Sequence, residues 1–365
     1  MTKKTYKSIA DSINQWVRPE IRALQAYHVP PATDCIKLDA MENPYQWPEA
    51  MVDEWVGLVK DVELNRYPDP SASLLKDRLR NSMSVPEGAD ILLGNGSDEL
   101  IQMLLMALTG KNKTVLSVAP SFVMYDMVAT YTGMNYISVP LNDDFSLDAA
   151  AFLAAIEQHT PAIIFIAYPN NPTGNLFKRT DLQKIIDAAP GVIVIDEAYH
   201  AFADDSFMDE AGQVNNLLVM RTVSKMGLAG LRLGLLAGKA EWLNEFDKVR
   251  LPYNLNVLTQ ATAQFALQHQ SVLDAQTETI CKNRELLFNA LSEIEGLQVY
   301  PSQANFILFR TRKGEASAIF NKLKEAGVLI KNLSPTGGAL GDCLRVTVGM
   351  PEENTAFIKA LKAAI

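Results

Sequence analysis

A lysine that follows two hydroxyl residues and precedes an arginine stands in the segment RTVSKMGLAGLRLG (221–234). Lys225 comes after Thr222 and Ser224, and Arg232 lies seven positions further on. A lysine in a loop is normally a solvated charge. Here small and apolar neighbours would desolvate the amine, which favours its neutral, nucleophilic form. The segment therefore indicates an activated amine close to hydroxyl and guanidinium groups that suit an anion.

Two carboxylates end an apolar run in VIDEAYHAF (194–202). Asp196 and Glu197 follow the strand-like residues, and Tyr199 comes three positions after Asp196. An acid at the end of a strand is often only a cap for the next helix. An aspartate that faces a cleft could instead pair with a cation there, and Tyr199 could reach the same place.

The segment GNGSDEL (94–100) combines a glycine turn with the start of a helix. The hydroxyl of Ser97 and the free N–H groups of the first helical turn could hold an anion. An ordinary capped helix explains the same residues, so the motif alone is weak evidence. Asp98 and Glu99 suit the helix dipole but would repel a phosphate, so we expect both to point away from it.

Polar side chains also mark two further apolar runs. YPNNPTG (168–174) directly follows the run at 162–167, and its prolines and glycine force a turn. A turn does not explain why an amide such as that of Asn171 stands at the mouth of a strand. In CLRVTVG (343–349), Arg345 lies inside an apolar strand and needs an anionic partner, either a structural carboxylate or a substrate.

Short apolar runs and helical stretches alternate from about Asn43 onward. The runs are continuously apolar, as in strands that are covered on both faces, and they include TVLSV (114–118), NYISV (135–139), AIIFIA (162–167), VIVID (192–196), NLLVM (216–220) and LGLLA (233–237). Between them lie amphipathic helical periods, such as residues 97–108. This alternation predicts an α/β domain with a mainly parallel sheet. Ligands of such sheets bind beyond the carboxyl ends of the strands, where most of the polar segments fall.

The pattern changes after about Leu258. A long helical stretch over 259–294 is followed by strand-like NFILF (305–309), a helix near 316–326, strand-like VLIKN (328–332) and LRVTV (344–348), and a terminal helix. This α+β pattern predicts a second, smaller domain, in keeping with a chain of 365 residues. We predict a large domain over 43–258, with an N-terminal arm (1–42) that joins residues 259–365 in the smaller one.

Composition and charge exclude several classes of protein. The 48% hydrophobic and 21% charged residues are typical of a globular protein. The net charge of −9 disfavours nucleic acid and anionic membranes as partners, and no apolar run is long enough to span a bilayer. Three scattered cysteines and four histidines form neither a disulfide framework nor a metal-ligand spacing. We therefore expect a cytoplasmic protein without a metal.

Taken together, NNPTG, DEAY, SK and the following arginine, in this order, resemble the fold-type-I aminotransferases that depend on pyridoxal 5'-phosphate. The resemblance implies an α/β fold with a large, mostly parallel sheet flanked by helices, plus a smaller α+β domain. The segments ENPY (42–45), NRYPDP (65–70) and LRVTVGMPEEN (344–354) are similar to the histidinol-phosphate aminotransferases within that family.

The resemblance also implies roles for individual residues. Lys225 would bond to the cofactor and move the substrate proton, Asp196 would keep the ring nitrogen protonated, and Tyr199 would bond the ring hydroxyl. The implied cofactor-binding residues are Gly96, Ser97, Phe122, Asn171, Asp196, Tyr199, Thr222, Ser224, Lys225 and Arg232, with Tyr67 reaching the cofactor phosphate of a neighbouring subunit. The implied substrate-binding residues are Tyr27, Asn43, Tyr253, Asn254, Lys331 and Arg345.

The implied reaction is amino transfer between L-histidinol phosphate and 2-oxoglutarate, in a homodimer. Two departures from the family pattern stand out: one residue fewer separates Lys225 from Arg232, and Lys331 stands where a second arginine is common. Another enzyme on the same scaffold, such as an aromatic aminotransferase or a threonine-phosphate decarboxylase, stays open. A nucleotide-binding dehydrogenase or NTPase is disfavoured, because the sequence has neither a GxGxxG motif after a first strand nor a GxxxxGK(S/T) motif. A non-catalytic regulator that binds the cofactor is disfavoured as well, because such proteins carry a DNA-binding module, for which the acidic chain has no spare length.

Overall fold

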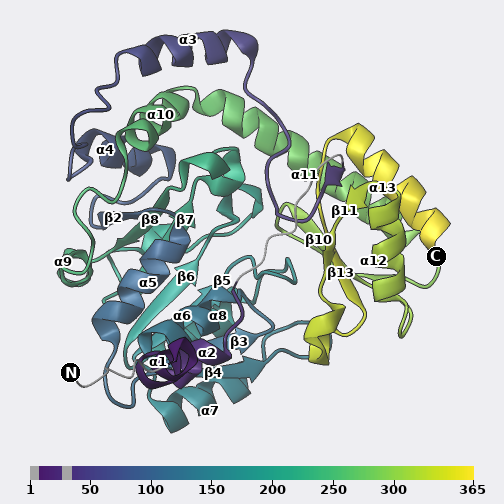
Figure 1. Cartoon of the computed structure of the whole chain (residues 1–365), viewed down its shortest axis with the longest axis horizontal. Coiled ribbons are helices and arrows are strands. Elements are labelled where there is room, and N and C mark those ends of the chain that lie inside the picture. The colour runs from purple at the N-terminus through teal and green to yellow at the C-terminus, as the bar shows by residue number, and fades with distance from the viewer. Residues whose placement is uncertain (1–7, 27–34) are drawn as a thin grey trace, which may run out of the picture.

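A central sheet dominates the computed structural model, which describes residues 8–26 and 35–365. Among these residues the sheet has seven strands (Figure 1), in the order β2 (Asp90–Gly94), β8 (Gly234–Gly238), β7 (Leu217–Thr222), β6 (Val192–Asp196), β5 (Ile163–Ala167), β3 (Thr114–Ala119) and β4 (Asn135–Pro140). The strands from β7 to β4 run parallel, and β8 joins antiparallel to both β7 and β2. The predicted α/β fold with a mostly parallel sheet is confirmed.

Both faces of this sheet are buried along its inner strands, which explains why those strands are continuously apolar, whereas the edge strand β4 is only partly buried. In β6, Ile193 and Ile195 pack into one hydrophobic cluster, and Val192 and Val194 pack into another on the opposite face. The flanking helices include α4 (Ser73–Ser82), α5 (Ser97–Leu108), α6 (Met124–Thr132), α7 (Ala149–His159), α8 (Arg179–Ala188) and α9 (Ala240–Asp247).

A second, antiparallel sheet lies beside the first and is formed mainly by the C-terminal part of the chain (Figure 1). Its order is β12 (Lys331–Asn332), β13 (Cys343–Thr347), β10 (Phe306–Arg310) and β9 (Gln298–Val299). The helices α12 (Ala316–Glu325) and α13 (Pro351–Ala364) pack with it around their own hydrophobic cluster. This α+β arrangement agrees with the fold class expected for the smaller part.

Two details of the C-terminal part differ from the sequence-based expectation. The stretch 328–332 is divided into β11 (Val328–Leu329), which pairs with β1 (Ile36–Lys37), and β12, which pairs with β13. The helical stretch 259–294 is divided into α10 (Val257–Gln268) and α11 (Gln270–Ser292), because His269 between them has a non-helical ψ of 33°. Neither break contains the glycine or proline that usually marks one.

The N-terminal segment contacts both parts of the molecule, and the consecutive helices α10 and α11 lead from the large part to the small one. The short helix α2 (Pro19–Ala23) packs against α6 beside the large sheet, whereas β1 joins β11 beside the small one. α10 packs against α4 and α3 (Glu49–Lys60), and α11 continues toward the small sheet (Figure 1). The domain boundary near Leu258 stays a prediction. Within residues 8–26 and 35–365, none of the helices has the length and apolar character needed to cross a membrane.

Candidate active site

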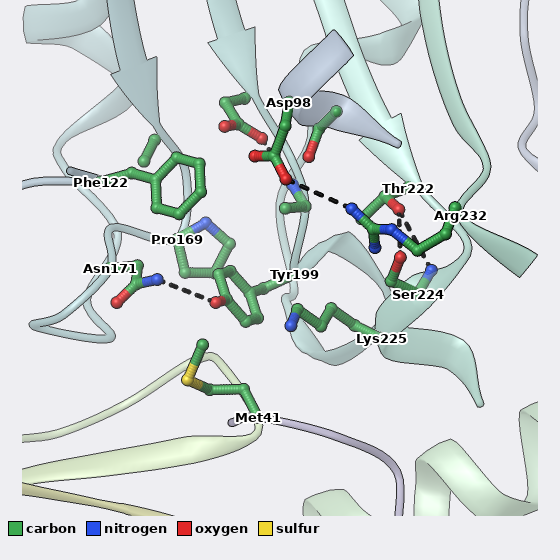
Figure 2. A pocket seen from close by; sticks show the side chains of 14 residues that line it. Met41, Asp98, Phe122, Pro169, Asn171, Tyr199, Thr222, Ser224, Lys225 and Arg232 are labelled. Atoms are coloured by element: carbon green, nitrogen blue, oxygen red, sulfur yellow. Dashed lines mark hydrogen bonds and ion pairs between the residues drawn. The ribbon is translucent and has the colours of Figure 1, made fainter. Parts of the chain in front are cut away.

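A pocket opens at the carboxyl ends of β5, β6 and β7, where the sequence patterns place the polar segments. Figure 2 shows it, and its lining comprises Met41, Ser97, Asp98, Phe122, Ala167, Pro169, Asn171, Asp196, Ala198, Tyr199, Thr222, Ser224, Lys225 and Arg232. Parallel strands bring their carboxyl ends to one edge of a sheet, so residues far apart in sequence meet here. Nine of the residues implied to bind a cofactor are thus brought together.

Lys225 lies in the short 3-10 turn Ser224–Met226 that follows β7. Its Nζ lies 3.4 Å from the carbonyl oxygen of Ala40 and 5.7 Å from the centre of the Tyr199 ring. Burial lowers the pKa of this amine to about 8, with a further lowering from the positive charge of Arg345. A substantial fraction of Lys225 is therefore neutral and nucleophilic near physiological pH.

Asp196 ends β6 with its carboxylate buried in the pocket wall. Its Oδ2 accepts a hydrogen bond of 2.6 Å from the hydroxyl of Tyr125, and its Oδ1 accepts one of 3.1 Å from the Ala198 N–H. Burial raises the pKa of Asp196 to about 6, although the Tyr125 hydrogen bond opposes that rise. At neutral pH the group is a buried anion that can hold a cationic ring nitrogen.

Asn171, Tyr199 and Arg345 form a hydrogen-bonded chain between the two sheets. The Asn171 Nδ2 donates to the Tyr199 hydroxyl at 3.0 Å, and its Oδ1 accepts from Arg345 Nη1 at 2.6 Å. Arg345 also donates through Nη2 to the carbonyl oxygen of Asp39 at 3.1 Å. Burial raises the pKa of the Tyr199 hydroxyl, so it stays protonated and can donate to a ligand oxygen. The arginine that the sequence marks as buried thus reaches the pocket's edge from β13.

Hydroxyl groups, a guanidinium and a helix start meet at the other end of the pocket. The hydroxyls of Thr222 and Ser224 lie 2.8 Å apart, and Thr222 also donates to the Leu233 carbonyl at 3.0 Å. Gly96 has a φ of 87°, in the left-handed region that favours glycine, and a Cβ there would lie 2.7 Å from Arg232 Nη2 and push the guanidinium away. Together with the first turn of α5, these groups can cradle a phosphate.

Asp98 is oriented differently from the expectation. Its carboxylate lines the pocket, and its Oδ2 lies 3.2 Å from Arg232 Nη2, because the guanidinium attracts it. Glu99 does turn away, since its Oε2 accepts from the backbone N–H of Asn95 and from the Asn254 side chain. An incoming phosphate would therefore compete with Asp98 for Arg232.

An aromatic ring and several apolar groups complete the lining. Phe122 lies with Met41, Pro169 and Tyr199 around the cavity in Figure 2, and its ring meets that of Tyr125 edge-on at 5.6 Å. The family resemblance implies Phe122, and Pro169 belongs to the predicted turn 168–174, but nothing in the sequence singles out Met41 or Tyr125. Apolar side chains in loops and a tyrosine on a helix carry no signal that separates a pocket wall from a core.

Two of the implied substrate residues lie away from this pocket. The Asn43 side chain donates to Gln276 Oε1 at 3.0 Å, and the Asn254 side chain donates to Glu99 Oε2 at 2.7 Å. Lys331 stands opposite Arg345 in the pairing of β12 with β13. Tyr27 lies outside the described residues.

Tyr67 and Tyr253 form an exposed pair outside the pocket. Their rings are stacked with centres 4.4 Å apart, and Tyr67 is 80% exposed. Such exposure of two aromatic rings is unusual for a surface that faces only water. The substrate and subunit roles of these residues stay predictions.

The described side chains fit pyridoxal 5'-phosphate. A phosphorylated pyridine aldehyde needs a neutral amine, a carboxylate for its ring nitrogen, donors for its ring hydroxyl and a phosphate cradle. Lys225, Asp196, Tyr199 and Arg232 line the same pocket and can meet these needs. The approach of Gly96 to Arg232 leaves the cradle free of any side chain at that position.

Comparisons with known proteins give one consistent result. The family model for aminotransferase class I and II matches residues 33–361. The chain is 56% identical to "Histidinol-phosphate aminotransferase 2" of Nitrosococcus oceani, covering 97% of this chain and 98% of that protein. It is 49% identical to the histidinol-phosphate aminotransferase of Chromobacterium violaceum, covering 96% of this chain and 98% of that one.

Solved structures show the same fold. The histidinol-phosphate aminotransferase of Sinorhizobium meliloti, crystallised with pyridoxal-5'-phosphate, has a TM-score of 0.85 at 24% identity, covering 95% of this chain and 96% of that one. L-threonine-O-3-phosphate decarboxylase of Porphyromonas gingivalis has a TM-score of 0.73 at 25% identity, covering 90% of this chain and 98% of that one. The fold alone therefore does not distinguish amino transfer from decarboxylation.

Proposed function

Because the chain belongs to the class I and II aminotransferases, we propose that it transfers an amino group from L-glutamate to imidazole-acetol phosphate, giving 2-oxoglutarate and L-histidinol phosphate. The cofactor is pyridoxal 5'-phosphate. The observation that carries the proposal is the near full-length identity of 56% to a histidinol-phosphate aminotransferase. The pocket supports it, because Lys225 and Asp196 face the same cavity.

The bound cofactor supplies an aldehyde that condenses with amines and a ring that delocalises the electrons left when a Cα proton departs. The chain's own residues do the rest. Lys225 provides the amine that carries this proton between carbon atoms, and its lowered pKa suits a base working near neutral pH. Asp196 keeps the ring nitrogen protonated, and the Tyr199 hydroxyl donates to the ring oxygen.

Arg345 is suited to both substrates. A guanidinium can bind a carboxylate or a phosphate through two parallel hydrogen bonds, so one residue can hold a glutamate and a phosphorylated amine in turn. Its Nη1 already reaches Asn171 beside the pocket. We propose Tyr27, Tyr253 and Lys331 as further substrate residues, together with Asn43 and Asn254, although both asparagines lie away from the pocket in the single chain.

We propose that the active unit is a homodimer working in the cytoplasm. Large apolar side chains close in sequence to the two tyrosines are exposed, including Leu64 at 71%, Leu74 at 69% and Leu251 at 72%. A second copy of the chain would bury them and could bring Tyr67 to its neighbour's phosphate cradle. Cys35, Cys281 and Cys343 are free cysteines, which suits a reducing compartment.

A panel of amine donors tests the proposal. With 2-oxoglutarate as acceptor, we expect kcat/KM for histidinol phosphate to exceed that for phenylalanine by about 100-fold or more, because a site built for a polar group rejects an analogue that lacks it. Glutamate formation measures the rate. Threonine phosphate with detection of released carbon dioxide serves as the control for the decarboxylase alternative.

Either of two results would contradict the assignment. Preference for phenylalanine over histidinol phosphate would place the chain among the aromatic aminotransferases. Release of carbon dioxide from threonine phosphate at a comparable rate would make it a decarboxylase.

Arg345→Lys should lower kcat/KM for the phosphorylated donor, because lysine keeps the charge but loses the two-pronged contact.

A further inference from the structure

Tyr125 is a buried tyrosine that the proposed mechanism does not use. It lies on α6, it is 0% exposed, and its hydroxyl donates to Asp196 Oδ2 at 2.6 Å. The carboxylate it contacts is the group proposed to hold the cofactor's ring nitrogen. A polar group buried this deeply is costly unless it is hydrogen-bonded, so the contact with Asp196 is a defined feature of the pocket wall.

The Tyr125 ring is fixed by aromatic contacts on two sides. It stacks on Phe165 of β5 with ring centres 4.7 Å apart and planes at 9°, and it meets Phe122 edge-on at 83°. Phe122 is the ring proposed to stack on the cofactor. One side chain therefore contacts both the counter-ion and the stacking ring.

We propose that Tyr125 is a positioning residue that keeps the Asp196 carboxylate ionised and aimed at the ring nitrogen of the bound cofactor. The inference rests on the proposed function, since it concerns the same site. The Ala198 N–H fixes Oδ1 of the carboxylate, and the tyrosine hydroxyl fixes Oδ2. Both carboxylate oxygens are thus held by a donor while the side chain lines the pocket.

The hydrogen bond from Tyr125 also opposes the surroundings that raise the pKa of Asp196. Burial raises the pKa of Asp196 to about 6, and the negative charges of Asp98 from α5 and of the adjacent Glu197 act in the same direction. The hydrogen bond from the Tyr125 hydroxyl lowers the pKa of Asp196 more than the bond from the Ala198 N–H does. Without the hydroxyl, part of the carboxylate would be protonated near neutral pH and would lose its hold on a cationic nitrogen.

The natural cofactor and one analogue of it isolate this effect without a measurement of activity. The apo-protein is titrated with pyridoxal 5'-phosphate and with its deaza analogue, in which carbon replaces the ring nitrogen. The ratio of the two dissociation constants reports the nitrogen's contact with Asp196, because the contributions of Lys225 and the phosphate cradle cancel. The ratio is measured between pH 5.5 and 8.5 for each variant.

Tyr125→Phe removes the hydroxyl and keeps the ring contacts. We expect the preference for the natural cofactor to fall about three- to tenfold at pH 5.5–6.5 and to approach the wild-type value by pH 8.5, as expected when the pKa of Asp196 rises by about one unit. Affinity for the deaza analogue should not change, which would show that the pocket is intact. The matched control is Tyr168→Phe, since the Tyr168 hydroxyl donates at 2.8 Å to another carboxylate, that of Asp205.

An Asp196→Asn background adds an independent measurement. There Tyr125→Phe should leave the analogue ratio unchanged, because the group on which the hydroxyl acts is absent. A ratio in the Tyr125→Phe variant equal to that of the wild type at every pH would overturn the inference alone. Equal affinity of the wild type for the natural cofactor and for the deaza analogue would overturn the proposed function as well.

Discussion

At the scale of single residues, the pocket is defined by the cost of burying charge. Lys225 and Asp196 both lie where burial favours their neutral forms, so their pKa values move toward each other, to about 8 and about 6. Near pH 7 the carboxylate is largely ionised and the amine is partly neutral. This is the pairing that a reaction needs when one group must hold a cation and the other must move a proton.

The lowered pKa of Lys225 predicts its reactivity in the apo-protein. Only the neutral amine is nucleophilic, so reductive methylation with formaldehyde should be half-maximal near pH 8. An ordinary lysine titrates about two units higher. Mass spectrometry of peptides gives the labelling rate at each pH, and exposed lysines in the same digest are the internal comparison. A midpoint near pH 10 for Lys225 would contradict the burial argument.

At the scale of elements, a buried ion pair ties the ends of two neighbouring strands together. Glu197, directly after β6, is 0% exposed and accepts from Arg221 Nε of β7 at 2.9 Å. The same carboxylate accepts from the Ser206 hydroxyl and from the Phe207 N–H. These two strands carry Asp196 and lead into Lys225, so the pair fixes the spacing of the proposed catalytic groups.

Removal of one member of this pair should destabilise the protein strongly. Arg221→Met leaves the Glu197 charge buried, and breaking such a pair costs about 3–5 kcal/mol in the free energy of unfolding. Urea unfolding measures the loss. The control is Lys248→Ala, which removes an exposed partner of Glu245 and should cost at most about 1 kcal/mol. A similarly small loss for Arg221→Met would show that Ser206 and Phe207 alone satisfy Glu197.

The elements that sequence patterns predict well are those whose burial is complete. Residues 192–196 and 162–167 are apolar on both faces, so their strand assignment needs no knowledge of the neighbours. The two-residue strand β11 is different, because only its pairing with β1 separates it from β12. That pairing joins segments almost 300 residues apart (Ile36 with Val328), and no local pattern contains it.

The same distinction holds for the candidate site. Polar side chains at the ends of apolar runs, such as Asn171 and Asp196, contrast with their surroundings and can be identified from sequence. Met41 and Tyr125 have no such contrast, because an apolar loop residue and a helical aromatic residue look like core. Their positions follow from packing between distant elements, which the sequence patterns do not contain.

At the scale of the whole molecule, a negative chain holds its anions with a few positive groups. The net charge of −9 opposes any long-range attraction of phosphates. Lys225 and Arg232 nevertheless line one pocket, and Arg345 lies at its edge. Anion binding is therefore a local property of the pocket, in which short contacts outweigh the weak and screened field of the remaining surface.

Leu64 is 71% exposed and lies three residues before Tyr67, which is 80% exposed. If a second copy covers this surface, Leu64→Glu places a charge in the interface and should shift the protein toward a monomer in sedimentation measurements. Cofactor affinity should fall about tenfold with it, because a monomer lacks the neighbour's Tyr67 at its phosphate cradle. The matched control is Leu286→Glu, since Leu286 on α11 is equally exposed, at 68%. Tyr67→Phe should weaken cofactor binding without changing the oligomeric state seen in sedimentation. A monomeric Leu64→Glu variant with unchanged cofactor affinity would show that each pocket is complete within one chain.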